Sequence, residues 1–164
     1  MQRLEADVVG GNMITKLREE TSTSVAIQKV LSNPLGVGNA TFRTGVKEPK
    51  RVDTVPFGLY KTNLLKELGG YDERLIRNHD IELSKRLLAR GAKIYLIPNA
   101  RCYYFARSTW RQLAKNNAQN GKWNLLTVFI TRDFSSLSLR HFVPLGFILS
   151  IILPLFAGIF FLPL

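Results

Sequence analysis

The chain of 164 residues has a single cysteine and about half as many acidic as basic residues. One thiol, Cys102, cannot form an internal disulfide, so nothing in the sequence points to an oxidising compartment. The 12 Asp and Glu residues are outnumbered by 23 Lys and Arg residues, which gives a net charge of +11. This imbalance predicts an anionic partner, such as a nucleotide phosphate, an acidic lipid or a nucleic acid.

Low-complexity tracts and phosphate-binding glycine loops are also missing. Hydrophobic residues make up 46% of the chain and charged residues 21%, which excludes a disordered polar chain. The length suits one domain with a hydrophobic core and is too short for two ordinary domains. Because no GxGxxG or GxxxxGKS motif is present, a nucleotide-using protein would have only the later half of its nucleotide-binding domain here.

The last 23 residues, 142–164, contain no charge at all. At about 1.5 Å per residue, a helix of this length crosses the roughly 30 Å hydrocarbon layer of a bilayer. We therefore predict a transmembrane helix over residues 142–164, with a buried C-terminal core helix as the alternative. The seven basic residues against one acid in 101–141, Arg140 among them, place residues 1–141 in the cytoplasm by the positive-inside rule.

Hydrophobic patterning and turn residues predict alternating strands and helices in the first hundred residues. Gly10 and Gly11 are expected to end the first strand, and Pro98 with Asn99 to separate the last two. This alternation predicts an α/β fold, a sheet layered with helices. Strands are expected at residues 6–11, 52–60, 93–97 and 101–105, helices at 21–31, 61–68, 79–90 and 108–129, and a glycine-rich loop at 35–45.

The most informative segment is Gly69–Leu87. If a helix begins near His79, a turn of about 100° per residue places Asp80 on the same face as Leu83 and Leu87. A carboxylate within an apolar stripe is a candidate general base that points into a cleft. The alternative is that Asp80 or Asn78 caps the helix by accepting free backbone N–H groups, and the spacing by itself favours the cap.

Four motifs occur in order along the chain, and together they cover most of it. They are GVGNATFRTG at Gly36–Gly45, VDTVPFG at Val52–Gly58, the run from Gly70 to Leu83, and RSTWRQLA at Arg107–Ala114. In this combination the chain resembles glycosyltransferase family 2, in particular the membrane-bound bacterial enzymes of succinoglycan-type exopolysaccharide synthesis. The resemblance implies the acceptor half of a GT-A fold over residues 1–106, an amphipathic basic connector over 107–141 and the transmembrane helix over 142–164.

The resemblance also implies a reaction. It is the inverting transfer of a sugar from a nucleotide-sugar donor to a lipid-linked or growing glycan acceptor, catalysed on the cytoplasmic side of the inner membrane. The position of the family's catalytic base is Asp80 in this chain. A carboxylate suits that task because an acceptor hydroxyl is a poor nucleophile until a base takes its proton.

Several further residues are candidates for substrate binding. Arg43 and Arg77 follow glycine-rich or helix-start backbone and are the loop cations best placed to meet phosphate. Glu82 is given a supporting part, orienting a loop or pairing with an arginine, with a solvated carboxylate as the alternative. The remaining candidates include Asn78 and Gly58. A stripe of amides and an indole, made by Gln112, Asn116, Gln119 and Trp123, suits the hydroxyls and the C–H face of a sugar. The alternative is a solvated helix face with Trp123 at the bilayer interface.

One expected feature of the family is missing from the chain. The Asp-x-Asp pair that would hold Mg or Mn on the nucleotide diphosphate does not occur before the first strand, so no metal ligand is predicted here. We therefore expect this chain alone to be inactive, as a truncated or split enzyme. The alternative is a non-catalytic, membrane-anchored remnant or interaction module, whereas nucleic-acid binding would need aromatic residues interleaved with a basic face, a pattern not found.

Overall fold

A computed structural model describes residues 4–38, 40–137 and 141–161. The chain is a mixed α/β protein, as predicted, with a four-stranded sheet in the order β2-β4-β1-β3. The parallel strands β1 (Val8–Lys16) and β4 (Ile94–Phe105) form its centre. The short edge strands β2 (Lys50–Arg51) and β3 (Leu59–Tyr60) pair antiparallel to β4 and β1, respectively. This arrangement is compatible with a Rossmann-like fold.

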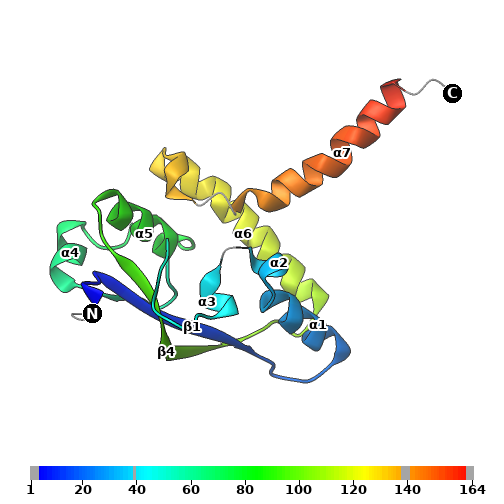
Figure 1. Ribbon diagram of the computed structural model, residues 1–164. Helices are drawn as coiled ribbons and strands as arrows, with labels where there is room; N and C mark the ends of the chain where they lie inside the picture. Colours follow the sequence, from blue (N-terminus) through cyan, green and yellow to red (C-terminus); the bar gives the residue numbers. More distant parts are fainter. Residues whose placement is uncertain (1–3, 39, 138–140, 162–164) are drawn as a thin grey trace.

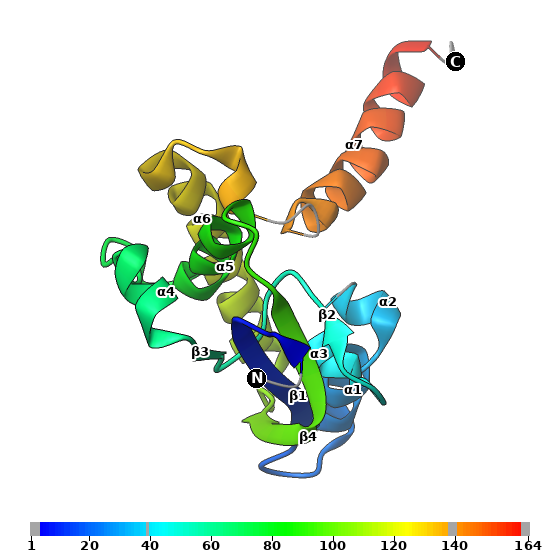
Figure 2. The same ribbon diagram turned by 60° about the vertical axis from the view of Figure 1, so that its left-hand side comes forward.

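The helices form two groups, one nearer the start of β1 and the other nearer its end (Figures 1 and 2). One group contains α4 (Thr62–Glu67) and α5 (His79–Ala89), and the other contains α1 (Ser22–Leu31), α2 (Pro34–Val37) and α3 (Thr41–Thr44). The long helix α6 (Trp110–Thr131) reaches both groups, because it lines a pocket with α1 and also hydrogen-bonds the residue that precedes α5. It is followed by the short 3-10 helix η2 (Phe134–Ser136) and by α7 (Val143–Phe161).

The main core lies between α5 and the two central strands. Leu83 and Leu87, one turn apart on α5, are fully buried against Val8, Ile94 and Leu96. This is the apolar face predicted from the helical spacing. The helix therefore owes its position to the burial of this stripe, at about 25 cal/mol per Å² of apolar surface. Asp80 lies one turn before Leu83 and Ser84, at the edge of the same face.

The prediction that Gly10 and Gly11 end the first strand is wrong. Strand β1 continues through both glycines to Lys16 and pairs with β4 along its whole length. The glycines are needed for close approach: a Cβ on Gly10 would collide with the Val55 side chain, and a Cβ on Gly11 would lie 2.5 Å from the Ala100 carbonyl oxygen. Their small size thus lets the Val55 side chain and the Ala100 backbone pack onto the strand.

The predicted break between two later strands is also wrong. Residues 94–105 form one strand, and Pro98 with Asn99 lies inside it. The register jumps from Gly11 opposite Ile97 to Asn12 opposite Arg101, so residues 98–100 have no partner on β1. Because proline has no N–H to give to the ladder, it is accommodated in this irregularity rather than ending the strand.

The C-terminal helix α7 projects away from the sheet (Figures 1 and 2). Most of its large apolar side chains are exposed, for example Phe147, Leu153 and Phe156. Within the described ranges of the chain, no helix is long and apolar enough to cross a membrane. The transmembrane helix predicted for residues 142–164 is therefore not supported. Arg140, used for the predicted orientation, and residues 162–164 lie outside the described residues.

Candidate functional site

The start of α5 is fastened to α6 by amide side chains. Asn78 adopts a left-handed backbone, with φ at 62°, and its side chain makes no capping bond. Instead its amide nitrogen donates to Asn124 Oδ1 at 3.0 Å and to Thr127 Oγ1 at 3.3 Å. Arg77 donates to Asn120 Oδ1 at 2.7 Å. Of the two residues considered as caps, Asn78 does not cap through its side chain, because that side chain bonds α6 instead.

The Asp80 carboxylate is half-buried in the first turn of α5. Its Oδ1 accepts the Ile81 N–H at 2.9 Å, which satisfies one of the free donors of the helix start, as the capping alternative expected. Its other oxygen has no hydrogen-bond partner among the residues that the structure describes. The carboxylate is thus oriented through one oxygen and can accept a proton or a hydrogen bond through the other.

Two tyrosines and a histidine lie beside Asp80. The ring of His79 packs edge-on against Tyr71, with 5.3 Å between centroids, and Tyr71 packs edge-on against Tyr60 at 6.4 Å. Burial raises the pKa of Tyr60, and the hydrogen bond with Tyr71 and the negative charge of Asp80 raise it further. Tyr60 therefore stays a neutral phenol within electrostatic reach of the carboxylate.

Gly58 supports this cluster through packing. A Cβ at Gly58 would lie 3.0 to 3.1 Å from the ring carbons and hydroxyl of Tyr60. The glycine therefore allows the Tyr60 ring to lie against the backbone of the VDTVPFG segment. The neighbouring Phe57 has a positive φ of 48° and is largely exposed. In the described structure, Gly58 acts on the site by placing Tyr60.

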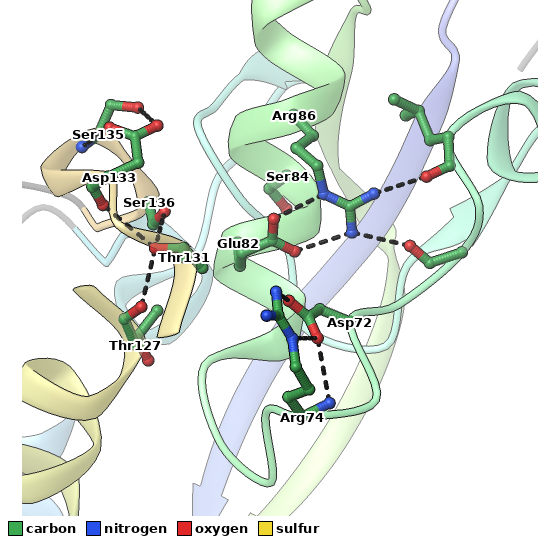
Figure 3. A network of polar contacts seen from close by, with 12 residues as sticks. Asp72, Arg74, Glu82, Ser84, Arg86, Thr127, Thr131, Asp133, Ser135 and Ser136 are labelled. Carbon is green, nitrogen blue, oxygen red and sulfur yellow. Dashed lines mark hydrogen bonds and ion pairs between the residues drawn. The ribbon is translucent and has the colours of Figure 1, made fainter. Parts of the chain in front are cut away.

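Glu82 is buried and forms an ion pair with Arg86, one turn later on α5 (Figure 3). Arg86 Nε and Nη2 donate to its two oxygens at 2.6 and 2.8 Å, and the guanidinium also donates to the carbonyls of Leu68 and Gly70, both at 2.8 Å. Glu82 is thus tied to an arginine that orients a loop, and the solvated alternative is wrong. An open pocket of about 340 Å³ is lined here by Glu82 and Arg86 rather than by Asp80.

The predicted amide stripe on α6 is only partly used. Asn116 accepts hydrogen bonds from Arg77 at 3.4 Å and from Arg107 at 3.2 Å. Gln112 accepts from the Ser108 N–H at the start of the helix, and Gln119 is exposed. Trp123 is half-buried. The polar face that meets α5 is made by Asn116, Asn120, Asn124 and Thr127, which accept hydrogen bonds from Arg77 and Asn78.

A second cluster of polar groups lies where β4 ends. Arg107 Nη1 donates to the Tyr104 hydroxyl at 2.7 Å, and the guanidinium carbon of Arg43 lies 4.8 Å from the centroid of the same ring. Arg43, predicted to meet phosphate, therefore lies beside Arg107, which sequence reasoning did not single out. Nothing in the sequence indicates this pairing, because 64 positions separate the two arginines and only the sheet brings them together.

Arg86 is the other residue that sequence reasoning missed. In this case a signal was present, since Glu82 and Arg86 are four residues apart on a predicted helix, the spacing at which side chains meet.

For the implied divalent metal, the residues present do not fit: the described part of the chain contains no group of three or more His, Cys, Asp or Glu side chains that could hold an ion. No step of the chemistry is assigned to a metal here.

A comparison with known proteins finds a similar enzyme. No family model matches the chain. Over 112 residues the chain is 30% identical to the dolichyl N-acetyl-alpha-D-glucosaminyl phosphate 3-beta-D-2,3-diacetamido-2,3-dideoxy-beta-D-glucuronosyltransferase of Methanococcus voltae. The match covers 68% of this chain and 34% of the relative, so the chain spans about a third of the length of that protein. The chain is therefore similar, over two thirds of its own length, to part of a glycosyltransferase.

Proposed function

We propose that the chain is part of an inverting glycosyltransferase that moves a sugar from a nucleotide-sugar donor to a sugar carried on a lipid phosphate. The observation that carries the proposal is the similarity to the Methanococcus voltae enzyme, whose name states a dolichyl glycosyl phosphate as its acceptor. The four ordered motifs support a place in glycosyltransferase family 2 and a GT-A fold. A role in cell-surface or extracellular polysaccharide synthesis is part of the same proposal.

Asp80 is the proposed catalytic base. The free oxygen of the Asp80 carboxylate takes the proton of the acceptor hydroxyl. At the same time the hydroxyl oxygen of the acceptor attacks the anomeric carbon of the donor sugar. The bond between this carbon and the diphosphate breaks, and the diphosphate leaves with the electron pair. The hydrogen bond from the Ile81 N–H to the other oxygen supports this role, because it orients the carboxylate before the substrate arrives.

We further propose that the chain works at the cytoplasmic face of the inner membrane. An acceptor anchored by a lipid must be met at a bilayer surface. Two features support this location. The exposed apolar side chains of α7 favour contact with lipid hydrocarbon, and the seven basic residues of 101–141 favour anionic headgroups.

The test is a transfer assay on protein that contains this chain. The donors are labelled nucleotide sugars, and the acceptor is N-acetylglucosamine linked through phosphate to a polyprenyl chain. We expect Asp80→Asn to lower kcat by about 10² to 10⁴ with little change in donor affinity, because asparagine keeps an oxygen for the Ile81 N–H but cannot take the proton.

Glu48→Gln, at an exposed carboxylate outside the four motifs, is the matched control and should transfer sugar at the normal rate. Near-normal turnover by Asp80→Asn would remove Asp80 as the base. If no donor in the panel supports transfer, the non-catalytic interaction module replaces the enzyme as the better account.

A further inference from the structure

Two arginines line a cationic pocket at the end of β4. Arg43, from α3, and Arg107, just after β4, approach Tyr104 from different elements, and both are half-buried. The cavity that they line has a volume of about 390 Å³. Among the described residues that line it, none is an aspartate or a glutamate, so neither cation has an acidic neighbour in the cavity wall.

The hydrogen-bonding capacity of this pocket is not met by the protein. Arg43 Nη1 is buried and has no hydrogen-bond partner within the part of the chain that the structure describes. Burial lowers the pKa of Arg43; Tyr104 opposes this effect, and the positive charge of Arg107 adds to it. Two neighbouring cations with an unmet donor are unfavourable until an anion supplies the missing acceptor and charge. Guanidinium groups are forked donors that suit phosphate oxygens.

An apolar groove continues from this pocket. It has a volume of about 620 Å³ and lies between α1, α6 and the start of α7. Leu31, Leu113 and His141 line both the pocket and the groove, so the two spaces adjoin. Their composition differs: the pocket has the arginines, whereas the apolar walls of the groove include Ile27, Val30, Trp110, Leu125, Phe142 and Leu145.

We propose that pocket and groove together bind a lipid phosphate, with Arg43 and Arg107 on the phosphate and the groove around the first part of the hydrocarbon chain. Charge complementarity selects the phosphate, and the adjoining apolar walls select a phosphate with a hydrocarbon tail over a free ion. The inference rests on the proposed function in one respect, since there the lipid phosphate is the carrier of the acceptor sugar. It assigns residues that Asp80 chemistry does not require.

The experiment measures binding of farnesyl phosphate to the full chain without any sugar donor. Trp110 lines the groove, so its fluorescence reports occupancy. Farnesol tests binding of the hydrocarbon chain without the phosphate, and inorganic phosphate tests binding of the phosphate without the hydrocarbon chain. We expect saturable binding of farnesyl phosphate, and affinities at least about tenfold lower for each of the other two ligands, since each lacks one of the two sets of contacts.

Arg43→Met and Arg107→Gln should each weaken farnesyl phosphate binding about tenfold or more, the effect of losing a charge-assisted hydrogen bond. Arg90→Gln, which removes the same charge from the exposed C-terminal cap of α5, should bind within twofold of the wild type. Wild-type affinity in both pocket variants overturns the site. If farnesol bound as tightly as farnesyl phosphate, the site would not recognise the phosphate. If inorganic phosphate bound as tightly, the site would not recognise the hydrocarbon chain.

Thermal unfolding separates a ligand-binding role of Arg43 from a structural one. Because Arg43 Nη1 is buried without a partner among the described residues, Arg43→Met should unfold at the same or a higher temperature than the wild type when no lipid is present. It should also lose the rise in unfolding temperature that farnesyl phosphate gives the wild type. A variant that fails to fold, or unfolds at a clearly lower temperature, would make Arg43 a structural residue and overturn its assignment to phosphate.

The outcome is distinguishable from that of the proposed function. Intact lipid phosphate binding in a protein that transfers no sugar would count against the glycosyltransferase proposal and leave this site standing. Normal transfer together with unchanged lipid affinity in both arginine variants would count against this site and leave the proposed reaction standing.

Discussion

Arg86 donates hydrogen bonds to both carboxylate oxygens of Glu82, the residue one helical turn before it, at 2.6 and 2.8 Å. The same guanidinium donates to the carbonyls of Leu68 and Gly70. A single side chain therefore pairs a buried charge and fixes the turn that connects α4 with the segment leading into α5 (Figure 3). Since Asp80 lies on the first turn of α5, this connection helps to hold the candidate base in place.

Glu82→Gln should lower the free energy of unfolding by about 2 kcal/mol, because Arg86 keeps its charge but loses half of its pairing in a partly buried position. Urea unfolding followed by circular dichroism measures the change. Asp72→Asn, which breaks the more exposed ion pair with Arg74, should cost less, about 0.5 kcal/mol. Equal losses in the two variants would contradict the structural role given to Glu82.

Gly10→Ala should destabilise the protein by about 2 kcal/mol or more, because the added Cβ collides with the Val55 side chain in the core. Gly121→Ala is the control: no heavy atom lies within 4 Å of its added Cβ, and the residue is inside α6. That change should stabilise the protein by about 0.5 to 1 kcal/mol through helix propensity. A Gly10→Ala protein as stable as the wild type would show that β1 and Val55 are not in contact as described.

Asn78 combines a left-handed backbone with two side-chain hydrogen bonds to α6, and two substitutions separate these contributions. Asn78→Gly loses the hydrogen bonds but tolerates the backbone, so we expect a loss of about 1 kcal/mol. Asn78→Ala loses the hydrogen bonds and also strains the backbone, so the loss should be about 2 kcal/mol. Chemical unfolding of both variants tests whether Asn78→Ala is the less stable of the two. If residue 78 had a right-handed backbone, Asn78→Gly would be the less stable variant.

Asp7 joins the start of the sheet to two distant segments, accepting hydrogen bonds from Lys61 Nζ and from the Lys93 N–H, both at 2.8 Å. The hydrogen bond from Lys61, followed by that from Lys93, lowers the pKa of the Asp7 carboxyl. A lowered folded-state pKa adds stability above the unfolded value, near 4, and this stability is lost as pH falls through the folded value. Asp7→Asn should therefore be about 1 kcal/mol less stable than wild type at pH 7.

That difference should shrink as the pH is lowered from about 4 towards 2, because the wild-type carboxyl then becomes protonated as well. Thermal unfolding of the two proteins across this pH range measures it. A difference that stays constant down to pH 2 would show that the lost interaction does not depend on the Asp7 charge.

Sequence patterning predicted the α5 helix and its buried stripe, because the period of 3.6 residues is a local property and the leucines follow it. It failed at Gly10 and Gly11 and at Pro98. At the glycines the same residues signal either a strand end or a close approach, and the choice depends on Val55 and Ala100, which are distant from them in the chain. At Pro98 it depends on the register irregularity between β4 and β1. The assignment of Asp80 as base followed from the family resemblance and stays a prediction.

Local sequence was enough to predict the mixed α/β class, the excess of positive charge and the position of Asp80 on the first turn of a helix, since each depends on composition or on neighbouring residues. The packing of distant segments was needed to show that the Asn78 side chain bonds α6 and does not cap α5, and that Arg43 meets Arg107 beside Tyr104. Hydrogen bonds and charge contacts between distant segments depend on sheet register and helix packing, which no local spacing encodes.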